Sequence, residues 1–193
     1  GCVFCASGML GVKRNLSAGE ILEQVLHLDR LLPLEERLTN IVVMGIGEPL
    51  ANLTNLLAVL DHVTEKGGLG LSPRRITIST VGLPEKIREL AALDKPFNLA
   101  VSLHLANDAE RDVLVPINRR YPLDVLAEAC ADYVAVTRRR LSFEWALIDG
   151  VNDTDRHAAE LAAYARPLRA HVNLIPLNPT PGYAVRGSAP GRV

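Results

Sequence analysis

The sequence predicts an α/β protein built on a parallel sheet, and three observations lead to this fold class. Short apolar runs alternate with longer amphipathic segments along the chain. Turn-forming residues separate the two kinds of segment. Hydrophobic residues make up 48% of the 193 residues and charged residues 22%, which suits one sizeable core and excludes a disordered or fibrous chain. Parallel strands joined by helices form either a barrel or a doubly wound sheet.

The first two elements are a helix over residues 18–32 and a strand over 40–44. Ser17 and Glu20 have the spacing of a capping box, and apolar residues follow it with helical periodicity. The strand is a short apolar run that ends at Gly45. This pair predicts a helix followed by a buried strand that leads into a tight turn.

The same cycle repeats in the middle of the chain. A helix is expected over 53–66, because Gly67 follows its last periodic residue. A β-branched run over 75–79 predicts the next strand. The helix over 84–93 begins with a proline, which is favoured in the first turn.

The second half continues the alternation. A strand over 97–103 is followed by what reads as a polar loop over 104–121, and then by a helix over 122–136. The last elements expected are a strand over 140–148, a helix over 153–165 and a strand over 171–175. The tail from Pro176 onward is rich in proline and glycine and is expected to be irregular.

Five parallel strands would place the loops that follow them at one edge of the sheet, where ligands bind in both kinds of α/β fold. These loops begin at Gly45, Ser79, Ser102, Asp149 and Pro176. The loop that holds Cys2 and Cys5 also precedes a helix, so we expect it to follow a further strand outside this chain and to lie at the same edge.

Charge and cysteine content limit the class of protein. The formal net charge of −1 excludes a strongly basic nucleic-acid module, so any contact with nucleic acid must be local. There is neither an apolar run of about 18 residues nor a signal-like start, which predicts a soluble, cytoplasmic protein. Three cysteines suit a reducing compartment better than a disulfide scaffold. Cys130 lies on the apolar face of a predicted helix and is expected in the core.

Cys2 and Cys5 form a Cys-x-x-Cys pair with three possible roles. The pair can be a redox dithiol, half of a zinc site or two ligands of an iron–sulfur cluster. The long separation from the helix cap at Ser17 disfavours a thioredoxin-like dithiol. A zinc site needs a second ligand pair, and the histidines show no ligand spacing. Cluster ligation is therefore favoured over zinc or incidental thiols.

The turn over residues 45–49 reads Gly-Ile-Gly-Glu-Pro and can bring backbone close to a ligand, while Glu48 offers a carboxylate to a cation. An ordinary strand-to-helix turn is the alternative. The helix-opening glycine of a dinucleotide fingerprint is missing, which disfavours nicotinamide binding. Ser79, Ser102 and His104 end two other predicted strands, and each alone is a weak signal. No hydrolase elbow, P-loop lysine or zinc-protease helix occurs.

Taken together, the motifs resemble the RlmN family of radical S-adenosylmethionine (SAM) enzymes, the dual-specificity methyltransferases of adenine C2 in 23S rRNA and tRNA. The resemblance covers essentially the whole chain. The motifs are the cysteine pair, Gly-x-Gly-Glu-Pro-Leu, Ser-Thr-x-Gly, Ser-Leu-His, Val115-Pro-Ile-Asn118, Asp149-Gly-Val-Asn-Asp153 and Asn173-Leu-Ile-Pro-Leu-Asn-Pro179.

The resemblance implies a fold and a set of site residues. The fold would be a partial (β/α)6 TIM-like barrel of the radical SAM type whose first strand is missing, with residues 1–193 forming a core domain truncated at both ends. Cys2 and Cys5 match the second and third cysteines that bind the family's [4Fe-4S] cluster, and Gly1 directly precedes the second. The residues that match the family's S-adenosyl-L-methionine site are Gly47, Glu48, Ser79, Ser102, Leu103, His104 and Asn178.

The resemblance also implies a reaction. Three thiolates leave one iron free for the methionine part of SAM, whose reductive cleavage yields a 5′-deoxyadenosyl radical. In the family, a methyl group is first transferred to a cysteine near the carboxyl terminus. A different cysteine later resolves the covalent adduct between protein and RNA. Neither cysteine is in this sequence, and the accessory amino-terminal domain is missing. We therefore expect the 193-residue chain alone neither to assemble a normal cluster nor to methylate RNA.

The partners implied are 23S rRNA, tRNA and an electron donor of the flavodoxin type, with no membrane and with the protein as a monomer. RNA phosphates are expected to meet the loops that carry Lys13, Arg14, Arg119 and Arg120. The arginines at 74–75 and 138–140 precede strands and should lie on the opposite rim as solvated surface.

Three alternatives remain open. The Cfr family looks alike but methylates C8 of the same kind of nucleotide. Another radical enzyme with a different substrate is disfavoured by the Ser-Leu-His and Asn-Leu-Ile-Pro segments. A non-enzymatic zinc-binding α/β module would be recognised by zinc without iron.

Overall fold

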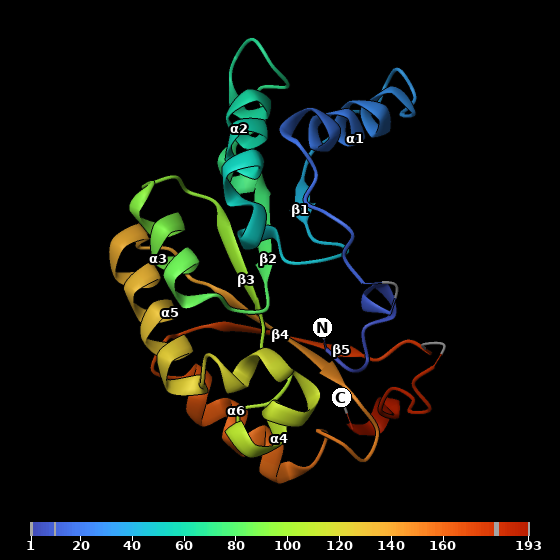
Figure 1. The fold of residues 1–193 in the computed structure, drawn as a ribbon, viewed down its shortest axis with the longest axis vertical. Coiled ribbons are helices and arrows are strands. Elements are labelled where there is room, and N and C mark those ends of the chain that lie inside the picture. The colour runs from blue at the N-terminus through green and yellow to red at the C-terminus, as the bar shows by residue number, and fades with distance from the viewer. Residues whose placement is uncertain (1, 10, 180–181, 193) are drawn as a thin grey trace.

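A five-stranded parallel sheet organises the molecule. The computed structural model describes residues 2–9, 11–179 and 182–192. The strands are β1 (Ile41–Val43), β2 (Ile76–Thr80), β3 (Asn98–Ser102), β4 (Ser142–Leu147) and β5 (His171–Pro176). Their order in the sheet is their order in the chain, and every neighbouring pair is parallel (Figure 1). The predicted α/β class and all five predicted strands are confirmed.

Because consecutive strands are parallel, all of their carboxyl ends lie at one edge of the sheet, which we call the carboxyl edge. The register places the ends of β2 and β3 side by side, because Thr80 of β2 is opposite Val101 of β3, whereas β4 continues beyond the end of β3, whose Ser102 is opposite Glu144. The loops that follow the strands are therefore neighbours in space, as the alternating sequence requires.

The described residues form six α-helices, of which α1 precedes β1 and the other five lie between strands. They are α1 (Ala18–Arg30), α2 (Leu53–Thr64), α3 (Pro84–Ala92), α4 (Asp108–Leu114), α5 (Leu123–Thr137) and α6 (Asp155–Ala165). Five of these were predicted within about two residues at each end, and Ser17 and Glu20 form the expected capping box. Figure 1 shows α3 beside α5 on one side of the sheet and α1 beside α2.

The predicted polar loop over residues 104–121 is wrong, because it contains α4 and a 3-10 turn over Pro116–Arg119. Asn107 caps α4, since its side chain accepts a hydrogen bond from the backbone N–H of Glu110 at 3.3 Å. The helix has only seven residues, and one of its two buried positions is Arg111. A short helix that buries a charged residue has no apolar periodicity by which sequence alone can find it.

The two faces of the sheet differ in polarity. In β2, Ile76 and Ile78 are fully buried beneath the helices, whereas Thr77 and Ser79 are half-buried on the other face. Cys130 of α5 is fully buried and belongs to the core cluster under the helices, as the sequence predicted. The opposite face is therefore the one that carries polar side chains toward the carboxyl edge.

The segment after β5 is irregular, as predicted, but it is tied to the sheet. The N–H of Leu177 donates to the carbonyl of Leu147 at 2.9 Å, and Ile148 forms an isolated antiparallel bridge with Gly187. A 3-10 turn over Pro190–Arg192 follows. None of the helices in the described ranges is long and apolar enough to cross a membrane.

A substitution at Gly82 tests how closely the turn after β2 packs against α5. Its φ is +101°, and a Cβ placed there would lie 2.7 Å from Cδ1 of Leu126. We expect Gly82→Ala to lower the free energy of unfolding by about 2–3 kcal/mol through backbone strain and a forced shift of α5. Urea denaturation measures this change.

Gly150→Ala is the matched control. Gly150 also has a positive φ, +68°, but a Cβ there meets nothing within 4 Å, so the free energy of unfolding should fall by only about 1 kcal/mol. Equal destabilisation of the two variants would contradict the close packing of Gly82 against α5.

Candidate functional site

The loop that carries Cys2 and Cys5 docks on the end of α4. The N–H of Val3 donates to the carbonyl of Leu114 at 3.1 Å, and the N–H of Cys5 donates to the carbonyl of Cys2 at 3.2 Å. Both cysteines are half-buried and free of disulfides. Burial raises the pKa of the Cys2 thiol, and a negative charge on Cys5 raises it further. The two sulfurs thus lie close enough to repel each other as thiolates.

The cysteine loop is also fixed to the turn after β3. The ring of Phe4, which lies between the two cysteines in sequence, meets the ring of His104 edge-on, with 4.9 Å between centroids. The loop is therefore at the carboxyl edge, where the sequence predicted it.

Glu48 joins the turn after β1 to the turn after β2. Its carboxylate accepts hydrogen bonds from the N–H of Leu50 at 3.0 Å and from the N–H of Val81 at 2.8 Å. Burial raises the pKa of this carboxyl, and these donors partly offset the effect. Glu48 is thus a half-buried acceptor whose hydrogen bonds fix its own turn and the neighbouring one.

The glycines of the same turn allow it to pack closely against the segment that contains Val12. Gly45 and Gly47 have φ values of +136° and +97°, which side-chain-bearing residues rarely adopt. A Cβ on Gly47 would lie 3.3 Å from Cγ2 of Val12. This turn therefore packs against the segment that follows the cysteine loop.

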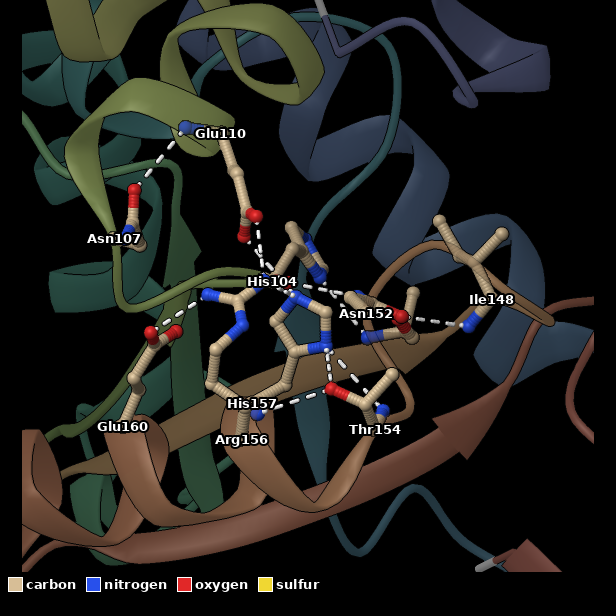
Figure 2. Close-up of polar contacts among 10 residues, drawn as sticks. His104, Asn107, Glu110, Ile148, Asn152, Thr154, Arg156, His157 and Glu160 are labelled. Carbon is tan, nitrogen blue, oxygen red and sulfur yellow. Dashed lines mark hydrogen bonds and ion pairs between the residues drawn. The ribbon is translucent and has the colours of Figure 1, made fainter.

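His104 joins the turn after β3 to the end of β4 (Figure 2). Its Nδ1 accepts a hydrogen bond from the N–H of Ala146 at 3.0 Å, so in the neutral ring the proton is on Nε2. Its carbonyl accepts from Nδ2 of Asn152 at 2.7 Å, and the same amide group donates to the carbonyl of Ala146 and accepts from the N–H of Ile148, both at 2.8 Å. Burial lowers the pKa of His104 to about 3, with a smaller contribution from the Arg111 charge.

The side chain of Arg111, on α4, forms hydrogen bonds with the turns after β2 and β3. Its Nε donates to the carbonyl of Leu103 at 3.0 Å, and Nη2 donates to the carbonyls of Val81 and Ser102 at 3.2 and 3.3 Å. Nη1 donates to Oδ1 of Asn118 at 2.6 Å. One side chain therefore satisfies carbonyl groups of both turns.

The remaining predicted residues also lie near the carboxyl edge. Ser79 and Ser102 lie at the carboxyl ends of β2 and β3 and are half-buried, and Leu103 is fully buried. Asn178 is exposed and follows the end of β5 by two residues. Gly1, which directly precedes the cysteine pair, lies outside the described residues.

The tail packs on the same group of loops. A Cβ on Gly182 would lie 2.7 Å from Cε of Met9, so the tail packs against the segment after the cysteine loop. The hydroxyl of Ser188 donates to Oδ2 of Asp153 at 2.7 Å, which ties the tail to the turn after β4.

With this geometry in view, comparison with known proteins identifies the family. The model of the radical SAM superfamily matches residues 1–162. This chain belongs to the radical SAM superfamily. The fold agrees: a radical SAM methyltransferase from Sphaerobacter thermophilus superposes with a TM-score of 0.96 at 49% identity, covering 100% of this chain and 57% of that one.

Curated proteins similar to this chain include RlmN proteins. Dual-specificity RNA methyltransferase RlmN 1 of Myxococcus xanthus is 50% identical over 194 residues, which is 100% of this chain and 54% of the relative. An RlmN relative from Rhodopirellula baltica is 53% identical over 186 residues, 96% of this chain and 50% of the relative. The chain therefore spans about half the length of the curated relatives it matches.

A group of metal-ligating side chains joins α4 to α6. Ligand atoms of Glu110, His157 and Glu160 lie within 4.8 Å of one another, the only such group of three or more among the described residues. The guanidinium of Arg156 donates to Glu110 at 2.5 Å and to Glu160 at 2.7 Å, as Figure 2 shows. Arg156 thus supplies the positive charge of this cluster. Within the described ranges, no third ligand converges on Cys2 and Cys5 to favour zinc.

The basic residues divide between the two edges of the sheet. Arg14 is ion-paired with Glu20 at 2.6 Å, and the guanidinium of Arg120 stacks on Tyr121, which leaves Lys13 and Arg119 as exposed cations near the site loops. Arginines 138–140 precede β4, as expected, and line a hollow of about 690 Å³ at the opposite end of the strands. Arg139 is held there by Asn98 at 2.5 Å, so it is not simply solvated surface.

Sequence reasoning missed Arg111 and Asn152, whose hydrogen bonds join neighbouring turns. Asn152 and Asn118 occur in the quoted motifs Asp-Gly-Val-Asn-Asp and Val-Pro-Ile-Asn, where the signal was present without an assigned role. Arg111 carried no signal, because the segment around it was read as a loop.

The buried neutral state of His104 predicts a pH dependence of stability. Its pKa is about 3 in the folded protein, against about 6.5 when unfolded, so below pH 6.5 the unfolded state takes up a proton that the folded state does not. The stability of the wild-type protein should fall by about 1.4 kcal/mol per pH unit from this group between about pH 6 and pH 4. Urea denaturation across this range measures the slope.

His104→Asn keeps an acceptor for the Ala146 N–H without titrating, so its slope should be shallower by that amount. His62→Asn, at an exposed position on α2, should leave the wild-type slope unchanged. If both variants have the wild-type slope, His104 is not held neutral by the fold.

Proposed function

We propose that this chain is the catalytic core of an RlmN-type radical SAM enzyme that methylates C2 of adenine in 23S rRNA and tRNA. The observation that carries the proposal is the seating of the Cys-x-x-Cys loop against His104, at the edge where Glu48 and the ends of β2 and β3 also lie. Identity near 50% to RlmN proteins along the whole chain supports the same substrate class.

The donor set fits two corners of a [4Fe-4S] cluster. Cys2 and Cys5 offer soft thiolate ligands, and the repulsion between their charges is relieved when both bind iron. In this proposal the first of the three cysteines belongs to sequence before residue 1, as the spacing of the family motif requires. When bound, the cluster supplies the electron that cleaves the sulfonium of SAM.

The roles of the other residues follow from their positions. Glu48 is a half-buried carboxylate next to the glycine turn and would accept hydrogen bonds from the ammonium group of SAM. Ser79 and Ser102 would present hydroxyls from the strand ends, with Gly47, Leu103, His104 and Asn178 completing the site. The neutral His104 ring packs against Phe4 and helps to exclude water from the sulfonium.

The rest of the enzyme is part of the proposal. In the described residues β1 pairs only with β2. The other side of β1 is therefore open to a preceding strand, which would complete a partial (β/α)6 barrel and lead into the cysteine loop. The relatives are about twice as long, which leaves room for an accessory domain and for the cysteine that carries the methyl group. A flavodoxin-type protein would supply the electron, and the enzyme would act as a cytoplasmic monomer.

Product analysis tests this function. The full-length protein, prepared without oxygen and given SAM and a reductant, should form 2-methyladenosine in 23S rRNA and tRNA, detected by mass spectrometry of nucleosides. In Cys5→Ser the absorbance of the four-iron cluster should disappear and the activity should fall at least 100-fold, because one iron no longer has its ligand. Cys130→Ser, which changes a buried thiol of α5 outside the Cys-x-x-Cys loop, should keep the cluster.

The outcomes separate the alternatives. Formation of 8-methyladenosine would assign the protein to the Cfr reaction instead. Zinc without iron in the anaerobic protein would support the zinc-binding module and contradict the enzyme.

RNA binding gives a further test. Replacing Lys13 and Arg119 with serine should weaken RNA binding and reduce the slope of log affinity against log salt by about 0.7–0.9 for each phosphate that is no longer neutralised. The control replaces Arg74 and Arg75, which precede β2 at the other edge of the sheet. An equal effect of both pairs would remove Lys13 and Arg119 from the RNA-binding surface.

A further inference from the structure

Arg111 is the buried charged group that the proposed function leaves without a role. Its side chain is 1% exposed, although it lies in a seven-residue helix at the carboxyl edge. Arginine is among the residues least often buried unless a partner of opposite charge accompanies it. Within residues 2–9, 11–179 and 182–192, no carboxylate forms an ion pair with Arg111; its four hydrogen-bond acceptors are all neutral.

The nearest acidic groups reach Arg111 only through an amide. Nδ2 of Asn118 donates to Oδ1 of Asp108 at 2.8 Å and to Oδ1 of Asp112 at 2.7 Å, while Oδ1 of Asn118 accepts from Arg111 at 2.6 Å. Asp108 is exposed, so water screens its charge. The positive charge of Arg111 is therefore only partly balanced inside the protein.

The charge lies beneath the cysteine loop. The backbone of Val3 is bonded to Leu114, one turn beyond Arg111 on α4, and Phe4 touches His104, whose neighbour Leu103 accepts from Arg111. Two hydrogen bonds and one ring contact therefore hold the cysteine loop against the segments that Arg111 joins.

We propose that Arg111 is a positioning residue with two effects: its hydrogen bonds fix the two turns that hold SAM, and its charge raises the reduction potential of the cluster bound by Cys2 and Cys5. This inference rests on the proposed function. Reduction moves one electron from a low-potential one-electron donor onto the cluster, with no bond or proton changed, so the site gains one negative charge. A cation in a low-dielectric site stabilises that added charge.

The experiment separates charge from geometry in the full-length protein with its cluster reconstituted without oxygen. Arg111→Gln keeps hydrogen-bond donors and removes the charge, while Arg111→Lys keeps the charge and removes the planar fork. Arg166→Met removes an equal charge from an exposed position after α6 and serves as the control. A dithionite titration followed by electron paramagnetic resonance gives the cluster potential of each variant.

The potential should follow the charge. At a given potential we expect about tenfold less reduced cluster in Arg111→Gln than in wild type, a shift of about 59 mV for one electron. Arg111→Lys and Arg166→Met should stay within about twofold of wild type. If Arg111 had only a structural role, the cluster potentials of Arg111→Lys and Arg111→Gln would shift by the same amount.

The affinity for SAM should follow the geometry. Equilibrium dialysis on the cluster-loaded protein should show at least tenfold weaker binding in Arg111→Lys, because an ammonium cannot bond the carbonyls of Val81, Ser102 and Leu103 in the same plane. Unchanged affinity in this variant would contradict the positioning effect.

Other outcomes also decide the matter. Asp112→Asn removes a negative charge near Arg111 without changing Arg111 itself, so it can be measured even if the Arg111 variants fail to fold. It should give about threefold more reduced cluster at a given potential. Equal potentials in wild type, Arg111→Gln and Asp112→Asn would overturn the inference alone, since the enzyme would still bind its cluster and SAM. A wild-type protein that binds no cluster would overturn the proposed function with it.

Discussion

Buried polar side chains that bond the backbone of a neighbouring turn are the constraint on which the carboxyl edge of this protein depends. A parallel sheet fixes where its strands end but leaves the N–H and C=O groups of the following turns without partners. Here Glu48, Arg111 and Asn152 each satisfy groups of two turns or of a turn and a strand end. Removing one would leave buried groups unpaired, which costs more than the bond itself contributes.

This constraint also sets the electrostatics of the site. The same burial that makes the hydrogen bonds strong lowers the pKa of His104 and raises that of Glu48, while Arg111 has no ion pair among the residues that the structure describes. A site with a partly balanced cation and closely spaced thiols favours a ligand that carries negative charge and soft metal ions. The proposed iron–sulfur cluster meets both conditions, whereas in the Glu110–His157–Glu160 group Arg156 already donates to both carboxylates.

The sequence predicted most of the fold because strands and long helices have strong periodic patterns. It located the turn at Glu48 because glycines interrupt an apolar strand there, and it placed the cysteine loop by its position before a helix. It failed at α4, a helix of seven residues in which one of the two buried residues is the charged Arg111. Partners such as Asn152 and His104 are 48 residues apart, and only the folded chain shows that they meet.

An anaerobic crystal structure of the full-length protein with SAM bound would test most directly whether these turns assemble one site. Density for a four-iron cluster on Cys2 and Cys5, with the amino group of SAM against Glu48 and the ring of Phe4 against His104, is the predicted result. A cysteine loop displaced from His104, or SAM bound away from the turn of Glu48, would contradict it.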